Sequence, residues 1–414
     1  MDRNVRVLAV GMAIRTFGSA LYSPFLALFL FSVMQISYVE IGVIFVAIGG
    51  VQLPFGFAGG LWADRIGRRR LIIVALATES ILVAALAYAF DIRSLALSIA
   101  VATVGGSLLA ASSAAFSAYI ADWGSGSERT RAFTWYRISF NAGFAVGAAL
   151  GGTLVEVIGF VDALLVASGV VAVATGFVVA TLAPSPVDLR LRHQGPVREP
   201  APAAPKPERS LRQSLALLSR DRTALVVATG FALAYLAVGQ WNVTFSLFVH
   251  NKLGISYFLL GIGLAMNGVL VVVAQSFTTE RLLGRRHTSI AIGGVVLYVI
   301  AYLLLGVAAL WALLPAILFL VAVVILTMGE NVVSIPSTTL PSNLAPAGEV
   351  GAYNGAFNTF LGAAGLASIF FGGAVLTAVA NPLLEWVLLV LPAIPAIAIL
   401  RYASRRIPIS MDRA

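Results

Sequence analysis

The chain has 414 residues, of which 59% are hydrophobic and only 11% are charged, far below the roughly one-quarter charged content of ordinary soluble domains. This composition excludes a water-soluble fold. The formal net charge of +9 does not indicate nucleic-acid binding, because the basic residues alternate with apolar runs instead of forming one stripe.

The first half of the chain contains six apolar runs, each long enough to match the ~20 residues that a helix needs to cross the hydrocarbon core. These runs cover residues 5–33, 38–61, 71–90, 94–120, 131–155 and 160–182. The first run is too long for a signal-peptide core and no small-residue cleavage site follows it, so we interpret it as a retained helix. Residues 1–183 are therefore predicted to form an N-terminal bundle of six transmembrane helices.

A segment rich in proline and arginine, residues 184–221, follows the first bundle. Its seven prolines and scattered arginines leave too little apolar surface to bury a core. We expect an extended or disordered cytoplasmic linker.

The second half repeats the pattern, with six runs that cover residues 222–249, 257–278, 288–308, 311–336, 351–378 and 383–403. Residues 222–414 are thus predicted to form a second bundle. The expected fold is an all-α membrane protein of twelve transmembrane helices in two pseudo-symmetric six-helix bundles.

The two halves also resemble each other in sequence. Ile36-Ser37-Tyr38 with Gly42 recurs as Ile255-Ser256-Tyr257 with Gly261, and each copy opens a helix that ends in an arginine-rich turn. Internal repeats of this kind are typical of transporters that bind substrate near the bilayer midplane. The repeat therefore favours a transport function.

The distribution of arginine predicts the orientation in the membrane. With both termini in the cytoplasm, most arginines fall on the cytoplasmic side, against only Arg93 and Lys252 outside, as the positive-inside rule requires. The cytoplasmic turn over residues 340–350 lacks Lys and Arg and is the weakest point of this topology. We expect a multi-pass protein of the plasma membrane.

The turn between the second and third predicted helices reads G-L-W-A-D-R-I-G-R-R over residues 60–69. This sequence resembles the G-x-x-x-D-R-x-G-R-R motif of the major facilitator superfamily. Family members use the turn as a latch for one conformational state, so the resemblance implies that role here. The implied latch residues are Gly60, Asp64, Arg65, Gly67, Arg68 and Arg69.

The resemblance extends over nearly the whole chain outside the linker. The turn around Asp122 and Arg129 and the pair Gly329-Glu330 both match, the latter resembling multidrug exporters of the superfamily. The second-half turn, residues 279–286, lacks the aligned Asp. We therefore expect a lopsided cytoplasmic latch that is stronger in the first half.

The fifth predicted helix carries glycines at a spacing of four, which place them on one helix face: Gly143, Gly147, Gly151 and the adjacent Gly152. They resemble the antiporter motif G-x-x-x-G-P-x-x-G-G, except that Ala148 replaces the proline. Two interpretations stay open, a packing face and an antiport motif. The fourth helix has no Arg, although drug antiporters of the family usually place one there.

Ionisable groups inside the membrane cost about 2.5 to 3.5 kcal/mol on insertion scales, so they should face the bundle interior or water. Glu330 is the predicted proton-coupling residue, with a structural acid as the alternative. Arg15, near the midplane of the first helix, and Arg137 are candidate cavity charges, and for Arg137 a structural ion pair is equally compatible with the sequence. Glu79 fits a structural partner better than a substrate ligand.

Uncharged polar side chains within predicted helices are further candidates for the substrate cavity, although asparagines also join helices by hydrogen bonds. The candidates are Trp241, Asn242, Asn331, Asn354 and Asn358.

The leading functional hypothesis is a secondary transporter that exports lipophilic or amphipathic small molecules by proton antiport and alternating access. An alternative is a symporter or uniporter for a small organic solute, including anionic ones. A third is a non-transporting membrane sensor or enzyme. With no Cys, no predicted intramembrane His and no P-loop, we expect no catalytic residues, metal or cofactor. The expected partners are a small-molecule substrate, protons and membrane lipid but no nucleic acid, and a monomer is expected.

Overall fold

The computed structural model describes residues 3–123, 126–194, 211–241, 243–311, 314–346 and 348–413. These residues form helices joined by short connections, which confirms the all-α prediction. Eleven of the helical segments are long and apolar enough to cross a membrane. One of them, Arg131–Thr181, has 51 residues, about 76 Å at 1.5 Å per residue, and is therefore long enough to cross the ~30 Å hydrocarbon core twice.

The double-length segment is helix α6 (Gly126–Thr181), in which Gly159 has a positive φ of 83°. A residue with a side chain rarely adopts this backbone conformation, whereas glycine does so readily. Gly159 therefore separates the predicted fifth and sixth helices. The eleven segments are consistent with the twelve predicted crossings.

The chain divides into two compact units, which are described separately below. Unit 1 consists of Met1–Gln35, Ile44–Ala201 and Ser256–Val269, and unit 2 consists of Ile36–Val43, Pro202–Ile255 and Leu270–Ala414. Each unit therefore contains a short segment from the other half of the chain. These two segments contain the repeated tyrosines, Tyr38 and Tyr257.

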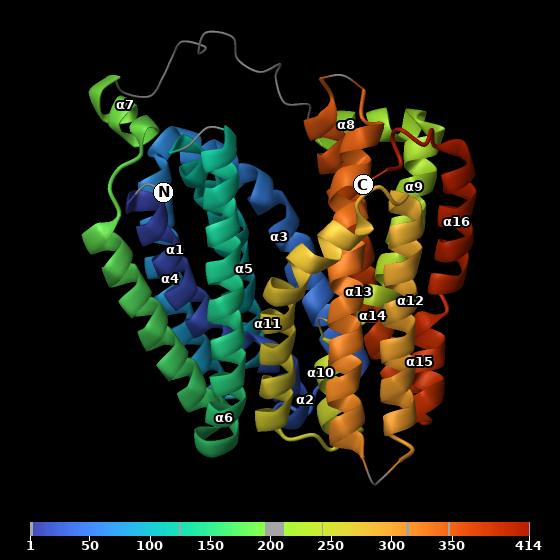
Figure 1. The fold of residues 1–414 in the computed structure, drawn as a ribbon. Helices are drawn as coiled ribbons and strands as arrows, with labels where there is room; N and C mark the ends of the chain where they lie inside the picture. The colour runs from blue at the N-terminus through green and yellow to red at the C-terminus, as the bar shows by residue number, and fades with distance from the viewer. Residues whose placement is uncertain are drawn as a thin grey trace. The chain divides into compact units, whose positions relative to one another are not determined.

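The helices that contribute to unit 1 are α1 (Arg3–Ala20), the 3-10 helix η1 (Ser23–Phe25), α2 (Leu26–Ser32), most of α3 (Tyr38–Ile66), α4 (Arg68–Asp91), α5 (Leu95–Asp122), α6, α7 (Pro186–Gln194) and the first half of α11 (Tyr257–Leu282). Helix α6 packs along both α1 and α4 (Figure 1). At one end of this unit Phe29 stacks on Phe90 with 3.6 Å between ring centroids. At the other end Leu8, Ile72, Phe116 and Tyr119 share a buried core.

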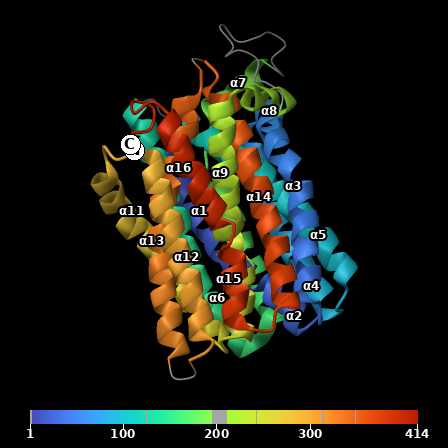
Figure 2. The same ribbon diagram turned by 90° about the vertical axis from the view of Figure 1, so that its right-hand side faces the viewer.

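The helices that contribute to unit 2 are the start of α3, α8 (Leu211–Arg220), α9 (Arg222–Val238), η2 (Gly239–Trp241), α10 (Thr244–Asn251), the second half of α11, α12 (His287–Ala308), α13 (Pro315–Leu344), α14 (Val350–Ala378), α15 (Pro382–Val390) and α16 (Ala393–Arg406). Helix α9 lies between α14 and α16 (Figure 2). Phe231 of α9 meets Phe357 of α14 edge-on at 5.6 Å. The predicted helix over residues 222–249 is interrupted at η2, as the first helix is at η1.

The two ends of the predicted linker are helical, in contrast to the extended chain expected there. Helix α7 is stabilised at its start by Asp188 and Ser185, which exchange backbone-to-side-chain hydrogen bonds of 2.8 and 3.2 Å. Helix α8 buries Leu218 against α14 and α9. The proline content therefore predicted the wrong structure at the two ends of the linker. There a local cap or an apolar face is sufficient to form a short helix. Residues 195–210 lie outside the described ranges.

The glycine face of α6 brings the backbones of two helices into close contact. A methyl group added at Gly143, Gly147 or Gly151 would collide with the backbone of Ala13, Phe17 or Leu21 respectively. Gly152 instead lies against the carbonyl oxygen of Tyr257. These close contacts in unit 1 support the interpretation as a packing face.

Replacing Gly147 by Ala should lower the stability of the protein by about 1 to 3 kcal/mol, because the added methyl group overpacks the contact with α1. Thermal unfolding of the purified protein in detergent measures the change. Gly169→Ala is the matched control on α6, since no atom lies within 4 Å of its added methyl group. Equal melting temperatures for the two variants would contradict the packing interpretation.

Candidate functional site

The buried arginine of the first helix is neutralised by an acid from another helix. Arg15 of α1 is only 4% exposed, and its Nε and Nη2 atoms bind the two carboxylate oxygens of Glu79 on α4 at 2.6 and 3.0 Å. Such a bidentate pair is the strongest geometry available to arginine and carboxylate. Tyr22 and Tyr136 lie close enough for their hydroxyl groups to interact with the charge of Arg15.

This pairing decides what Arg15 offers to a substrate. We expected Arg15 to be a cavity charge and Glu79 to be a structural partner. In the structure Nε and Nη2 of Arg15 bind Glu79, and Nη1 lies 3.9 Å from the sulfur of Met12. An anionic group could therefore reach only the guanidinium N–H groups that Glu79 does not bind.

The arginine-rich turn of unit 1 contains a second charge network. Arg68 binds Asp64 at 3.2 Å on its own side and Asp122, at the end of α5, also at 3.2 Å. Asp64 is largely exposed, whereas Arg68 and Asp122 are mostly buried. Arg68 therefore links the end of α3 to the end of α5. The carboxylate of Asp64 remains exposed to solvent.

The next residue, Arg69, fixes the end of the sixth membrane helix. Its Nε donates to the carbonyl oxygen of Leu182 at 2.6 Å and its Nη2 donates to that of Val179 at 2.9 Å. Its backbone N–H donates to the carboxylate of Asp188 at 3.2 Å. We call these four residues the Arg69 clamp. It satisfies carbonyls that the helix end leaves unpaired.

The second-half turn contains an equivalent arrangement in unit 2. Arg286 donates to the carbonyl oxygens of Ser404 and Ile407 at the end of α16 and binds the carboxylate of Asp412 at 2.6 Å. We call these residues, with Thr288, the Arg286 clamp. The backbone N–H and hydroxyl of Thr288 donate to Asp412 at 2.9 and 2.7 Å, so this acid caps the start of α12.

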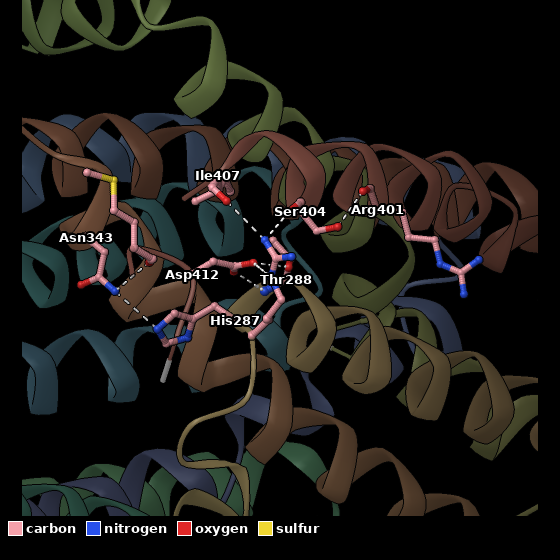
Figure 3. Close-up of polar contacts among 9 residues, drawn as sticks. His287, Thr288, Asn343, Arg401, Ser404, Ile407 and Asp412 are labelled. Atoms are coloured by element: carbon pink, nitrogen blue, oxygen red, sulfur yellow. Dashed lines mark hydrogen bonds and ion pairs between the residues drawn. The ribbon is translucent and has the colours of Figure 1, made fainter. Parts of the chain in front are cut away.

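Figure 3 shows His287 and Thr288 beside Asp412, while the guanidinium group of Arg401 points away from this cluster. Asp412 is completely buried. His287 lies next to Thr339 and Asn343, which adds a contact from α13.

The two clamps share one design although their acids come from different sequence contexts. In each unit the second arginine after the turn glycine, Arg69 or Arg286, binds the end of the sixth helix. An Asp beyond that helix binds the start of the third. The turn itself begins at a glycine with positive φ in both cases, Gly67 at 95° and Gly284 at 78°. Asp412 is thus the counterpart of Asp188, whereas Asp64 is the acid that the second-half turn lacks. No motif around Asp412 could have revealed this role.

Glu330 lies on α13 in unit 2, 15 residues after Pro315 and therefore ~22 Å along the helix at 1.5 Å per residue. It is half-buried. Its charge is within range of the hydroxyl groups of Tyr235 on α9 and of Tyr298 and Tyr302 on α12. Tyrosines from two neighbouring helices thus surround the predicted coupling residue.

The other predicted site residues do not gather at one place. Asn331 is buried, and the amide of Asn354 exchanges hydrogen bonds with Ser342. Trp241 packs on Phe245 with 4.4 Å between ring centroids, and Asn358 is exposed. All four belong to unit 2.

In unit 1, Arg137 and Arg65 are exposed, and no atom lies within 4 Å of a methyl group placed on Gly60. Asn242 lies outside the described residues.

Comparisons with known proteins agree on one family. The model of the Major Facilitator Superfamily matches residues 8–369. The chain is 25% identical over 380 residues to the uncharacterized MFS-type transporter YttB of Bacillus subtilis (strain 168), a match that covers 91% of this chain and 89% of that protein.

Solved structures show the same fold at low sequence identity. The POT family transporter PepTSo has a TM-score of 0.77 at 15% identity, and the match covers 98% of both chains. The nucleoside transporter NupG has a TM-score of 0.73 at 12% identity, covering 98% of this chain and 100% of that one. At these identities the likeness establishes the fold alone.

Removing one partner of the Arg15–Glu79 pair should lower the stability of the protein more than removing both partners. Arg15→Gln or Glu79→Gln alone leaves one buried charge unpaired and should destabilise the protein by about 3 to 5 kcal/mol. The double variant leaves no charge and should be more stable than either single variant. Thermal unfolding of all three in detergent tests this, and additive losses would show that the two residues are not coupled.

Asp412→Asn should destabilise unit 2 by about 2 to 3 kcal/mol, because it removes the ion pair with Arg286 and weakens the cap of α12. The measurement is again the melting temperature of the purified protein. Arg401→Gln is the control, since its charge points away from the clamp (Figure 3). An unchanged melting temperature for Asp412→Asn would mean that the Arg286 clamp does not stabilise the bundle.

Proposed function

Because this chain belongs to the major facilitator superfamily, and is therefore a membrane transporter for a small molecule, we propose that it exports lipophilic or amphipathic compounds by proton antiport. Transport would follow alternating access, in which the substrate site opens to one side of the membrane at a time.

The observation that carries the proposal is the position of Glu330. This carboxylate lies inside a membrane-spanning helix, half-buried, with tyrosines of α9 and α12 nearby. Burial favours the neutral form of a carboxyl group, and an acid that exchanges protons within the bundle is what coupling requires. A change in charge at Glu330 would alter the packing preference of the helices around it.

The Arg15–Glu79 pair supports a neutral or cationic substrate over an anionic one. Glu79 binds the guanidinium group through Nε and Nη2, and the pair as a whole carries no net charge. This weighs against the alternative of a symporter or uniporter for an anion.

The arginine-rich turn of unit 1 is proposed to act as the conformational latch. Its geometry supports that role, since Arg68 is held between Asp64 and Asp122 and Asp64 remains accessible. The proposed orientation has both termini and the turn in the cytoplasm, following the arginine distribution. We further propose that the protein works as a monomer in the plasma membrane.

Glu330→Gln should abolish uphill transport while keeping substrate binding. Wild-type and variant proteins are reconstituted in liposomes, a proton gradient is imposed, and the movement of a fluorescent lipophilic cation is followed. A glutamine cannot exchange a proton, so we expect at least a tenfold loss of gradient-driven uptake with exchange at equal pH retained.

The matched control is Glu280→Gln, which removes an exposed carboxylate of unit 2 and should behave as wild type. Normal proton-driven transport in Glu330→Gln would rule out Glu330 as the coupling residue. If folded wild-type protein moves the cation only down its gradient, proton antiport itself is wrong and a uniporter becomes the better explanation.

A further inference from the structure

A second intramembrane acid lies in unit 2, at the end of the bundle opposite the Arg286 clamp. Glu385 is the fourth residue of α15 and its side chain is completely buried. One carboxylate oxygen, Oε1, accepts a hydrogen bond from Nζ of Lys252 at 3.0 Å. Lys252 follows α10 and is 24% exposed, so only the base of this pair reaches solvent.

The pairing leaves part of the acid unused. Among the described residues no group donates a hydrogen bond to Oε2 of Glu385, although that atom is buried. The indole N–H of the adjacent Trp386 is also buried and without an acceptor. Since buried polar atoms are normally satisfied, Glu385 has one oxygen available for a proton. A pair that served stability alone would be expected to use both oxygens.

The surroundings of Glu385 connect it to Glu330. Trp386 stacks on Tyr302 with 4.5 Å between ring centroids and an interplanar angle of 11°. The ring centroid of Tyr302 lies 5.9 Å from that of Tyr298, which is one turn earlier on α12. The charge of Glu330 acts on the hydroxyl groups of both tyrosines. Trp386, Tyr302 and Tyr298 thus form a row of aromatic side chains inside unit 2 that begins beside the buried acid.

We propose that Glu385 is a second proton-binding carboxylate of unit 2, paired with Lys252 when ionised and released from it when protonated. The proton binds Oε2, which weakens the contact between Oε1 and Nζ. Loss of the proton restores the ion pair. The other ionisable group that faces the acid is Tyr38, from the start of α3.

The inference rests on the proposed proton antiport and extends it. With the termini in the cytoplasm, Glu385 lies at the extracellular end of unit 2, where an exporter takes up its driving proton. Glu385 would load the proton and Glu330 would couple it to the substrate. Both acids belong to unit 2.

The test compares Glu385→Gln with the double variant Lys252→Gln/Glu385→Gln. The single variant leaves Lys252 unpaired and can lower stability, whereas the double variant removes both charges. A proton-binding role predicts that proton-driven uptake of the cation falls at least tenfold in both variants, with exchange at equal pH within twofold of wild type. Glu40→Gln, an exposed carboxylate at the start of α3, is the control and should match wild type.

A second readout follows the proton itself. The infrared difference spectrum between high and low pH should contain a band from a protonated carboxyl group that is missing in Glu385→Gln and present in Glu40→Gln. Restored proton-driven uptake in the double variant, or an unchanged infrared spectrum in Glu385→Gln, would overturn the proposal and leave a static ion pair. If the wild type shows no proton-driven uptake, the antiport function fails, and the infrared band alone decides whether Glu385 binds a proton.

Discussion

The apolar interior of each helix bundle requires that an ionised side chain be matched by a partner from another helix. Arg15 meets Glu79 across α1 and α4, and Lys252 meets Glu385 across α10 and α15. An isolated charge in such surroundings is too costly to keep. The helices are therefore joined in pairs by their charges.

The fold could be predicted from the sequence because the membrane limits the possibilities. Apolar runs of sufficient length must be helices, and the G-x-x-x-D-R-x-G-R-R turn identified the family. The partner of Arg15 was harder to predict. Helical rise gives the depth of a residue, but not the direction in which its side chain points. Arg15 was therefore assigned to a cavity although Glu79 lies at a similar depth. The substrate site could not be predicted for the same reason, because it depends on the side-chain directions of many helices at once.

The clamps illustrate a second limit. Arg69 and Arg286 stand in recognisable turns, yet their acids, Asp188 and Asp412, occur in segments that carry no pattern. The same geometry has been reached by residues at different distances beyond the sixth helix of each half, six after Leu182 and five after Ile407. Geometry is therefore more symmetric than sequence in this protein. The predicted lopsided latch concerns the turns themselves, where the halves differ because the second lacks the aligned Asp.

The exchange of short segments between the units also bears on how the chain is made. Unit 1 includes residues 256–269, and unit 2 includes residues 36–43, so each unit needs a piece encoded in the other half. Tyr257 reaches the backbone of Gly152, and Tyr38 reaches that of Gly373. During synthesis, the first bundle must wait for the eighth membrane helix before its glycine face is fully covered. Each unit is therefore completed by a segment that is encoded in the other half of the chain.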